Sequence, residues 1–143
     1  MLSSKELGEL LRGSGYKVTP QRLAVYEVLA ERHWHPSAEM LYAGLQQRYP
    51  AISLATVYKT VEILQKINVI QIINIGENSL RYDADIHPHH HVQCTLCGSV
   101  ADIELKAAGL DGINSQAEAE SGYLISGRQF NFYGICPNCR REH

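Results

Sequence analysis

The stretch that decides the fold runs from Ser53 to Asp83 and reads SLATVYKTVEILQKINVIQIINIGENSLRYD. Its first half predicts a helix, because Ser53 is a good N-cap and an apolar stripe follows at helical spacing. The stripe consists of Leu54, Val57, Val61 and Leu64. Its second half holds two β-rich runs separated by GENS at 76–79, which predicts a hairpin. A helix followed by a β-hairpin is the layout of a winged helix, whose recognition helix enters the major groove of DNA.

Three more helices are predicted before this stretch. The first covers SSKELGELLRGSG at 3–15 and stops at a glycine. The second lies in VTPQRLAVYEVLAER at 18–32, where Thr19 is the N-cap and Pro20 takes the first helical position. The third lies in SAEMLYAGLQQRY at 37–49 and is capped by Ser37, after a turn that holds His35. Residues 1–83 are therefore predicted to form a winged helix-turn-helix domain.

The pattern changes after Asp83. Strands are predicted for HHVQC at 90–94 and SVADIEL at 99–105, and a helix for GLDGINSQAEAESG at 109–122. A long strand is predicted for YLISGRQFNFYGIC at 123–136, broken or turned near Gly127. This order predicts a small α/β domain over residues 84–143. The whole chain is thus expected to be an α+β protein of two small domains.

The composition is that of a globular protein, with 143 residues, 45% hydrophobic and 20% charged. No apolar run approaches the roughly 18 residues that a membrane span needs, and the N-terminal segment lacks the apolar region of a signal peptide. We therefore expect a cytoplasmic protein with no membrane partner. Residues 1–82 hold nine Lys/Arg against seven Asp/Glu, whereas residues 83–143 hold four against eight. The small positive excess lies in the predicted winged-helix half.

The four cysteines form two CxxC pairs, Cys94 with Cys97 and Cys136 with Cys139. Two residues between thiols allow both sulfurs to bind one ion, and four thiolates are a ligand set of structural zinc. The alternatives are redox dithiols or inert buried cysteines. Matched pairs with no odd thiol favour a structural Zn²⁺ ion, which would stabilise the fold and do no chemistry.

A second ligand set contains imidazoles and carboxylates. If residues 89–91 are extended, His89 and His91 point to one face and His90 to the other. Asp102, on the following strand, could approach that face across a hairpin. Two further candidates, Asp83 and His35, come from the boundary and from the first half. Such a set without thiolates favours Fe²⁺, Mn²⁺ or Zn²⁺, although each residue alone could be an ordinary surface residue.

Several motifs, in this order, resemble the ferric uptake regulator (Fur) family. They are VTPQR at 18–22, HPSAEMLY at 35–42, SLATVYKT at 53–60, LRYD at 80–83, HHHVQCTLCG at 89–98 and YGICPNC at 133–139. The resemblance covers nearly the whole chain. It implies a homodimer of two-domain chains, with an N-terminal winged helix and a C-terminal α/β dimerisation domain.

The resemblance also implies the ligand sets. The structural zinc ligands would be Cys94, Cys97, Cys136 and Cys139. The regulatory Fe²⁺ or Mn²⁺ ligands would be His35, Asp83, His89, His91 and Asp102. An aspartate at 102 is similar to the peroxide-sensing (PerR) branch, whereas iron-sensing relatives more often carry glutamate. Arg128 and Gly109 stand where a histidine and a glutamate of a further metal site would be expected. Zinc-sensing relatives tend to recruit a cysteine to the sensor site, and here all four cysteines are already used.

The function implied is that of a metal-dependent repressor, not an enzyme, which binds a palindromic double-stranded DNA operator. Peroxide would be sensed through iron-catalysed oxidation of His35 or His89. The DNA-binding candidates are Lys17, Arg22, Ser53, Thr56, Tyr58 and Lys59. The alternative within the family is an iron- or zinc-responsive uptake repressor. Outside it, the rivals are a metalloenzyme with an open His/Asp site and a zinc-dependent interaction module without a sensor.

Overall fold

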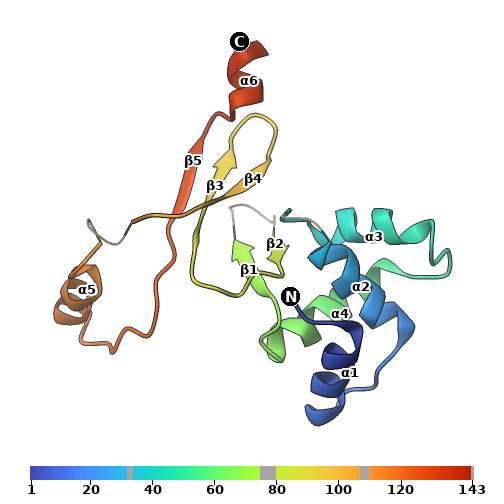
Figure 1. Cartoon of the computed structure of the whole chain (residues 1–143). Coiled ribbons are helices and arrows are strands. Elements are labelled where there is room, and N and C mark those ends of the chain that lie inside the picture. Colours follow the sequence, from blue (N-terminus) through green and yellow to red (C-terminus); the bar gives the residue numbers. More distant parts are fainter. Residues whose placement is uncertain (32–33, 75–79, 107–109, 143) are drawn as a thin grey trace. The chain divides into compact units, whose positions relative to one another are not determined.

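The structure is a computed structural model that describes residues 1–31, 34–74, 80–106 and 110–142. The chain divides into two compact units, residues 1–87 and residues 88–143, called here the first and second units (Figure 1). The first unit contains the helices and the hairpin predicted around residues 53–83. The second contains the strands and helices predicted after the boundary.

Four helices make up most of the first unit: α1 (Ser4–Gly13), α2 (Pro20–Ala30), α3 (Ala38–Gln46) and α4 (Leu54–Lys66). Each begins after an N-cap whose side chain accepts the backbone N–H three residues on. The caps are Ser3, Thr19, Ser37 and Ser53. The caps predicted at residues 19, 37 and 53 are therefore confirmed, and the helices start where the sequence placed them.

Two short strands follow α4, β1 (Gln71–Asn74) and β2 (Leu80–Asp83). They pair antiparallel with Gln71 opposite Asp83, which confirms the predicted hairpin. Its turn, GENS at 76–79, lies outside the described residues. The buried apolar core of the first unit joins the helices to the hairpin and includes Leu7, Leu11, Val25, Leu29, Leu41, Leu45, Val57, Leu64 and Tyr82. This is the winged-helix layout.

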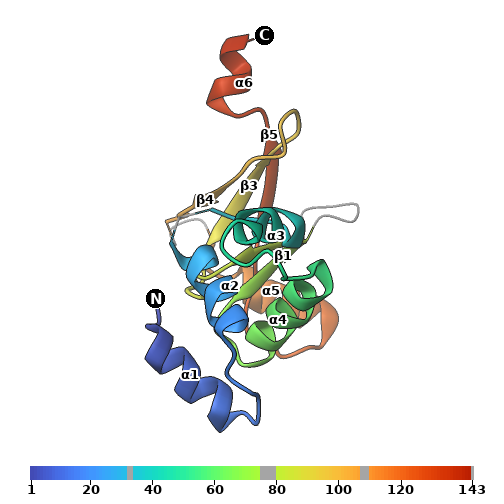
Figure 2. The same ribbon diagram turned by 90° about the vertical axis from the view of Figure 1, so that its right-hand side faces the viewer.

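The second unit contains β3 (His90–Cys94), β4 (Val100–Ile103), α5 (Ile113–Ser121), β5 (Asn131–Gly134) and α6 (Pro137–Glu142). Its sheet has the order β4-β3-β5, with β3 antiparallel to β4 and parallel to β5 (Figure 2). The predicted order of strand, strand, helix and strand is confirmed. The helix begins at Ile113, later than predicted, and Gly109 lies outside the described residues.

The predicted long strand over residues 123–136 was wrong, because only 131–134 form a strand. Gly122 ends α5 with a left-handed backbone, φ +73°, and residues 122–130 have no regular structure. β-Propensity alone does not make a strand, since a partner must supply the hydrogen bonds. β3 supplies partners only from His91 to Cys94. The short helix α6 was not predicted, although Pro137 occupies the first helical position, where it is favoured.

The described residues of the second unit form almost no apolar core. Among its described residues, only His91 and Cys94 are buried. No residue of α5 is buried, and Figure 1 shows this helix apart from the sheet β3–β5. A small domain normally needs a packed core, a metal or a partner to be stable. The second unit therefore depends on interactions other than its own apolar packing.

No helix in the described part of the chain is long and apolar enough to cross a membrane.

Candidate metal centres and recognition helix

The four cysteines come together at one end of the second unit. They are free thiols, and their sulfur atoms lie within 4.8 Å of one another. Zn–S bonds of about 2.3 Å in a tetrahedron place neighbouring sulfurs about 3.8 Å apart. The Cys97 and Cys136 sulfurs lie 3.8 Å apart. The cluster therefore fits a tetrahedral metal ion with four sulfur ligands.

Parallel pairing of β3 with β5 builds this cluster from segments far apart in sequence. Thr95 N–H donates to the carbonyl of Gly134 at 2.8 Å, and Cys136 N–H donates to Cys94 Sγ at 3.3 Å. The first CxxC turn closes through Gly98 N–H, which donates to the carbonyl of Cys94 at 2.9 Å. Gly98 has φ +72°, a conformation that favours glycine. The two CxxC pairs thus meet although 38 residues separate Cys97 from Cys136.

The pKa values of the thiols in this cluster indicate that a bound cation would stabilise their deprotonated form. Hydrogen bonds from the backbone N–H groups of Cys97 and Cys136 lower the pKa of the Cys94 thiol to about 6. The neighbouring Cys136 and Cys97 thiols raise the pKa of Cys139 to about 12. One thiolate forms readily, whereas the fourth is opposed by its neighbours. A bound divalent cation would remove this opposition, since thiols that coordinate a metal are deprotonated.

The second unit also holds three of the predicted regulatory ligands. Asp102 Oδ1 lies 3.2 Å from His89 Nε2 and 3.5 Å from His91 Nε2. The two imidazole rings are 4.5 Å apart between centroids. The pairing of β3 with β4 places Asp102 directly opposite His91. Two imidazoles and one carboxylate thus converge, as the alternation along the strand predicted.

Gln129 contacts one ring of this group from the segment before β5. Gln129 places its side-chain amide 3.2 Å from His91 Nδ1. Alternation along the strand turns His90 to the other face, where its ring lies 5.0 Å from that of Phe130 and its Nδ1 accepts Phe130 N–H. The atom of Gln129 that faces the ring is the amide nitrogen. With the amide flipped, its oxygen would accept a hydrogen bond from Nδ1–H and leave the lone pair of Nε2 to a metal.

The first unit holds the other two regulatory candidates. His35 Nε2 lies 3.4 Å from Asp83 Oδ2. The carboxylate of Asp83 accepts the N–H of Asp85 at 2.8 Å and the side-chain amide of Gln71 at 3.3 Å. The five predicted ligands therefore fall into two groups, one in each unit, and both groups have donor atoms close enough to bind an ion.

A further metal site would draw on residues 128 and 109. Arg128 donates to Asn114 Oδ1 at 2.8 Å and supplies no metal ligand. Gly109 lies outside the described residues.

Helix α4 begins with a network that orders its first turn. Ser53 Oγ accepts Thr56 N–H at 3.1 Å and lies 2.8 Å from Thr56 Oγ1. Tyr58 and Lys59 are exposed. The Tyr58 hydroxyl donates to Glu39 Oε1 of α3 at 2.5 Å. This bond raises the pKa of Tyr58 and lowers that of Glu39. Sequence reasoning missed Glu39, because its partner lies on another helix.

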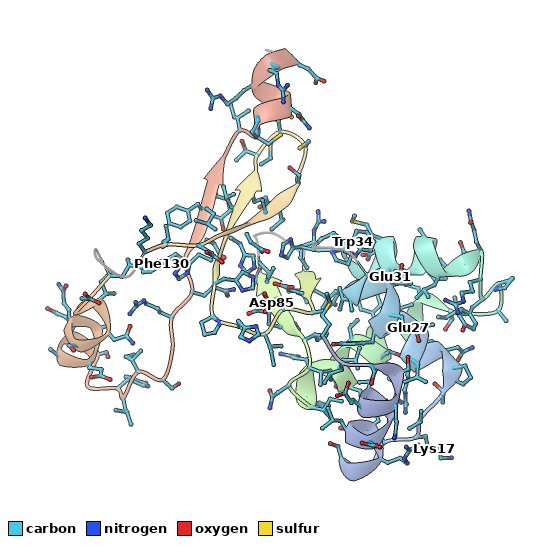
Figure 3. All side chains as sticks on the ribbon, viewed as in Figure 1. Lys17, Glu27, Glu31, Trp34, Asp85 and Phe130 are labelled. Atoms are coloured by element: carbon cyan, nitrogen blue, oxygen red, sulfur yellow. The ribbon has the colours of Figure 1, made fainter. Side chains whose placement is uncertain are left out.

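The two basic candidates before α2 lie together. Lys17 is exposed at the connection between α1 and α2 (Figure 3). Arg22 is half-buried and donates from Nη1 to the carbonyl of Lys17. Lys17 is thus an exposed cation, whereas the Arg22 side chain already has a backbone partner.

The model of the ferric uptake regulator family matches residues 13–133. The chain belongs to the ferric uptake regulator family. The peroxide-responsive repressor PerR of Staphylococcus epidermidis is 31% identical over 132 residues, which cover 92% of this chain and 87% of that protein. The peroxide stress regulator of Campylobacter jejuni is 34% identical with a TM-score of 0.68, covering 97% of this chain and 100% of that one. The ferric uptake regulator of Vibrio cholerae is 26% identical with a TM-score of 0.75, covering 91% and 99%.

These likenesses confirm the fold class, an N-terminal winged helix followed by a C-terminal α/β dimerisation domain. Proteins of the Fur family are metal-responsive regulators of transcription. The thiol cluster and the His/Asp groups of this Fur-family chain can each bind metal. Named relatives include both PerR and Fur proteins.

The cap of α4 gives a first prediction for this Fur-family protein. Ser53→Ala is expected to lower the free energy of unfolding by about 1 kcal/mol, since Thr56 N–H loses its acceptor. Chemical denaturation of zinc-loaded protein would measure the change. Ser53→Asp is the matched control, because aspartate is an equally good cap. It should restore stability while weakening DNA binding through its negative charge. Equal stability of Ser53→Ala and the natural protein would contradict the capping role.

Proposed function

We propose that this chain is a cytoplasmic, metal-dependent repressor that releases DNA when peroxide oxidises one of its metal-binding histidines. The observation that supports it best is the division of the regulatory ligands. His35 and Asp83 meet in the first unit, whereas His89, His91 and Asp102 meet in the second. Neither group alone completes the five-ligand set. An ion that used both would bind the two units to each other.

The thiol cluster is proposed to hold a structural Zn²⁺ ion. Four sulfur ligands leave no open position for a substrate, so this ion would stabilise the second unit only. The scarcity of buried apolar side chains among the described residues of that unit supports this proposal, because such a unit would gain stability from the ion.

The regulatory ion, Fe²⁺ or Mn²⁺, is proposed to act as a switch. The three imidazoles and two carboxylates supply hard and intermediate ligands that suit these ions. Ligation by both units would favour one arrangement of the DNA-binding half. To shift such an equilibrium from 1:99 to 99:1, the ion must prefer that arrangement by about 5.5 kcal/mol. Metal–ligand bonds made only in that arrangement could supply this preference.

DNA binding is assigned to α4 and its flanks. Thr56, Tyr58 and Lys59 would face the major groove, and Ser53 would order the start of the helix. The first turn of α4 has no acidic residue, so its N–H groups can approach a phosphate. Lys17 and Arg22 would contact the DNA backbone, so affinity should fall steeply with salt. A palindromic operator would present one half-site to each subunit.

The homodimer is proposed to form through the second unit. β5 is an edge strand of its sheet, and Phe132 and Tyr133 on it are exposed at 41% and 58%. Tyr123 and Leu124, just after α5, are exposed at 75% and 92%. An uncovered edge strand and exposed large apolar side chains are typical of a protein interface. A second copy of the unit would bury both.

Peroxide sensing is proposed for the His/Asp site because residue 102 is aspartate and the relatives of about 31–34% identity are named for peroxide. When bound, Fe²⁺ supplies the electron that splits peroxide and so produces an oxidant beside the imidazoles. His35 and His89 are the proposed targets. An oxidised imidazole is a poor ligand, so the two ligand groups would separate and repression would end.

Mass spectrometry tests this proposal. After micromolar peroxide, iron-loaded protein should gain one oxygen on His35 or His89, whereas manganese-loaded protein should not. Cleavage after Arg32 and Arg48 gives a peptide that also holds Trp34 and Met40, so fragment ions must locate the oxygen. Oxygen on the Met40 thioether is counted separately, because Met40 contacts the Arg81 side chain that binds the carbonyl of His35.

Asp102→Glu sharpens the same test. The longer side chain should still bind Mn²⁺ but should reduce histidine oxidation, because the carboxylate can no longer keep its place between the two imidazoles. If the natural iron-loaded protein gains no oxygen on either histidine, yet binds DNA only with metal, it is an iron- or zinc-responsive repressor without peroxide sensing.

A further inference from the structure

Arg81 lies on β2, two residues before Asp83, and so shares its face of the strand. Its Nη1 donates to the backbone carbonyl of His35 at 3.0 Å and lies 3.3 Å from Met40 Sδ. A guanidinium stays protonated and has no lone pair, so Arg81 cannot bind a metal ion itself. Its role must be sought in the residues that it holds.

The segment that Arg81 holds is fixed at successive points. The carbonyl of His35 accepts from Arg81, and the carbonyl of Pro36 accepts the N–H of Tyr82 at 3.0 Å. The next residue, Ser37, caps α3. The backbone of His35 is thus tied to β2 on one side and to the start of α3 on the other. The bonds from Arg81 to His35 and from Tyr82 to Pro36 are called here the clamp. β2 also carries Asp83, so the clamp fixes His35 relative to the carboxylate that it faces.

Only one bond of the clamp depends on a side chain and can be removed by substitution. The bond between Tyr82 and Pro36 joins two backbones and survives any change of side chain at 81. The bond to His35 depends on the guanidinium alone. Loss of Arg81 should therefore leave the hairpin docked while it frees the peptide that orients the imidazole. Residues that orient metal ligands from behind commonly contribute about 10- to 100-fold to metal affinity.

We propose that Arg81 is a positioning residue of the regulatory metal site, which fixes the backbone of His35 and so tunes the affinity for a divalent ion. The inference rests on the proposed function, because it requires that His35 and Asp83 bind the ion. Arg81 would act by positioning and not by its charge. The direction in which metal affinity changes when Arg81 is replaced therefore tests the inference.

Electrostatics and positioning predict opposite effects. Removal of a positive charge near a bound cation should by itself tighten the binding of that cation. Removal of a positioning contact should weaken it. Arg81→Met keeps the length and apolar stem of the side chain but loses charge and donors. Arg81→Lys keeps the charge but loses the planar fork. Arg48→Met is the matched control, since Arg48 is an exposed arginine of the same unit, paired with Glu27.

Mn²⁺ is titrated into zinc-loaded protein without DNA. The electron paramagnetic resonance signal of free Mn²⁺ measures how much remains unbound. Arg81→Met should bind Mn²⁺ about 10- to 100-fold more weakly, Arg81→Lys should show a smaller loss, and Arg48→Met should match the natural protein. The visible absorption of Co²⁺ in the site should change in both Arg81 variants. Zinc content should stay unchanged.

Equal or tighter Mn²⁺ binding by Arg81→Met would overturn the inference and leave the proposed function intact, provided that Asp83→Asn abolishes binding in parallel. If Arg81→Met does not fold, Arg81→Lys decides, because unchanged affinity in that variant would equally overturn the inference. If Asp83→Asn binds Mn²⁺ as well as the natural protein does, the metal site itself is misassigned and both proposals are wrong.

Discussion

Cys136→Ser is expected to remove the zinc ion and to unfold residues 88–143, while residues 1–87 stay folded. The reason is the lack of buried side chains in the second unit, whose described residues bury only His91 and Cys94. Structural zinc contributes about 10–16 kcal/mol to the folding of small zinc domains. The packing among the described residues of this unit is too sparse to replace it. The first unit has its own apolar core and does not share this dependence.

Hydrogen exchange resolved by peptide, together with zinc content, measures this result. Amides of β3, β4 and β5 should exchange rapidly in Cys136→Ser, whereas those of α2 and α4 should stay protected. Asn138→Ala is the matched control, because it changes the same CxxC turn but keeps all four thiols. If Cys136→Ser retains one zinc per chain and protects β3 as before, the thiol cluster is not what stabilises the unit.

Asp83→Asn is expected to abolish metal-dependent DNA binding without unfolding the protein. The amide has nearly the same shape, so it can still meet Gln71 and the N–H of Asp85 in part. It lacks the charge that a divalent ion requires. The apparent DNA affinity follows the fraction of protein in the competent arrangement. If loss of the ion lowers that fraction from about 99% to about 1%, DNA binding should weaken by about 100-fold.

A duplex enriched from a random pool by the manganese-loaded natural protein serves as the DNA probe. Its affinity for each variant would be measured with and without Mn²⁺, at fixed salt. Asp111→Asn removes an exposed carboxylate of the second unit and should change neither affinity nor metal response. Retention of Mn²⁺-dependent binding by Asp83→Asn would show that the first unit contributes no ligand to the switch.

The sequence predicted well the features that depend on neighbours along the chain. The caps at Thr19, Ser37 and Ser53 are local hydrogen bonds, and the apolar stripe of α4 follows the helical period. The convergence of His89 and His91 also follows from local alternation. The Fur-family motifs then placed Asp102 and Asp83, which periodicity alone could not assign.

Features that depend on distant partners were missed or wrong. The strand over residues 123–136 is limited to 131–134 by what β3 can pair with. Glu39 and Arg81 act through Tyr58 and through the backbone of His35, which are 19 and 46 positions away in sequence. No period or motif in the sequence joins such pairs. They become visible only when helices and strands are packed.

The parallel pairing of β3 with β5 brings together thiols that are far apart in the sequence. The thiols meet only after the intervening loop, which includes α5 and the exposed Tyr123 and Leu124, has been closed, and this closure costs chain entropy. Under the proposed function, cells short of zinc would therefore make chains whose first unit folds but whose second unit cannot form the dimer. Such chains would be silent whatever their iron or peroxide level, so zinc supply would determine how many sensors exist before any signal arrives.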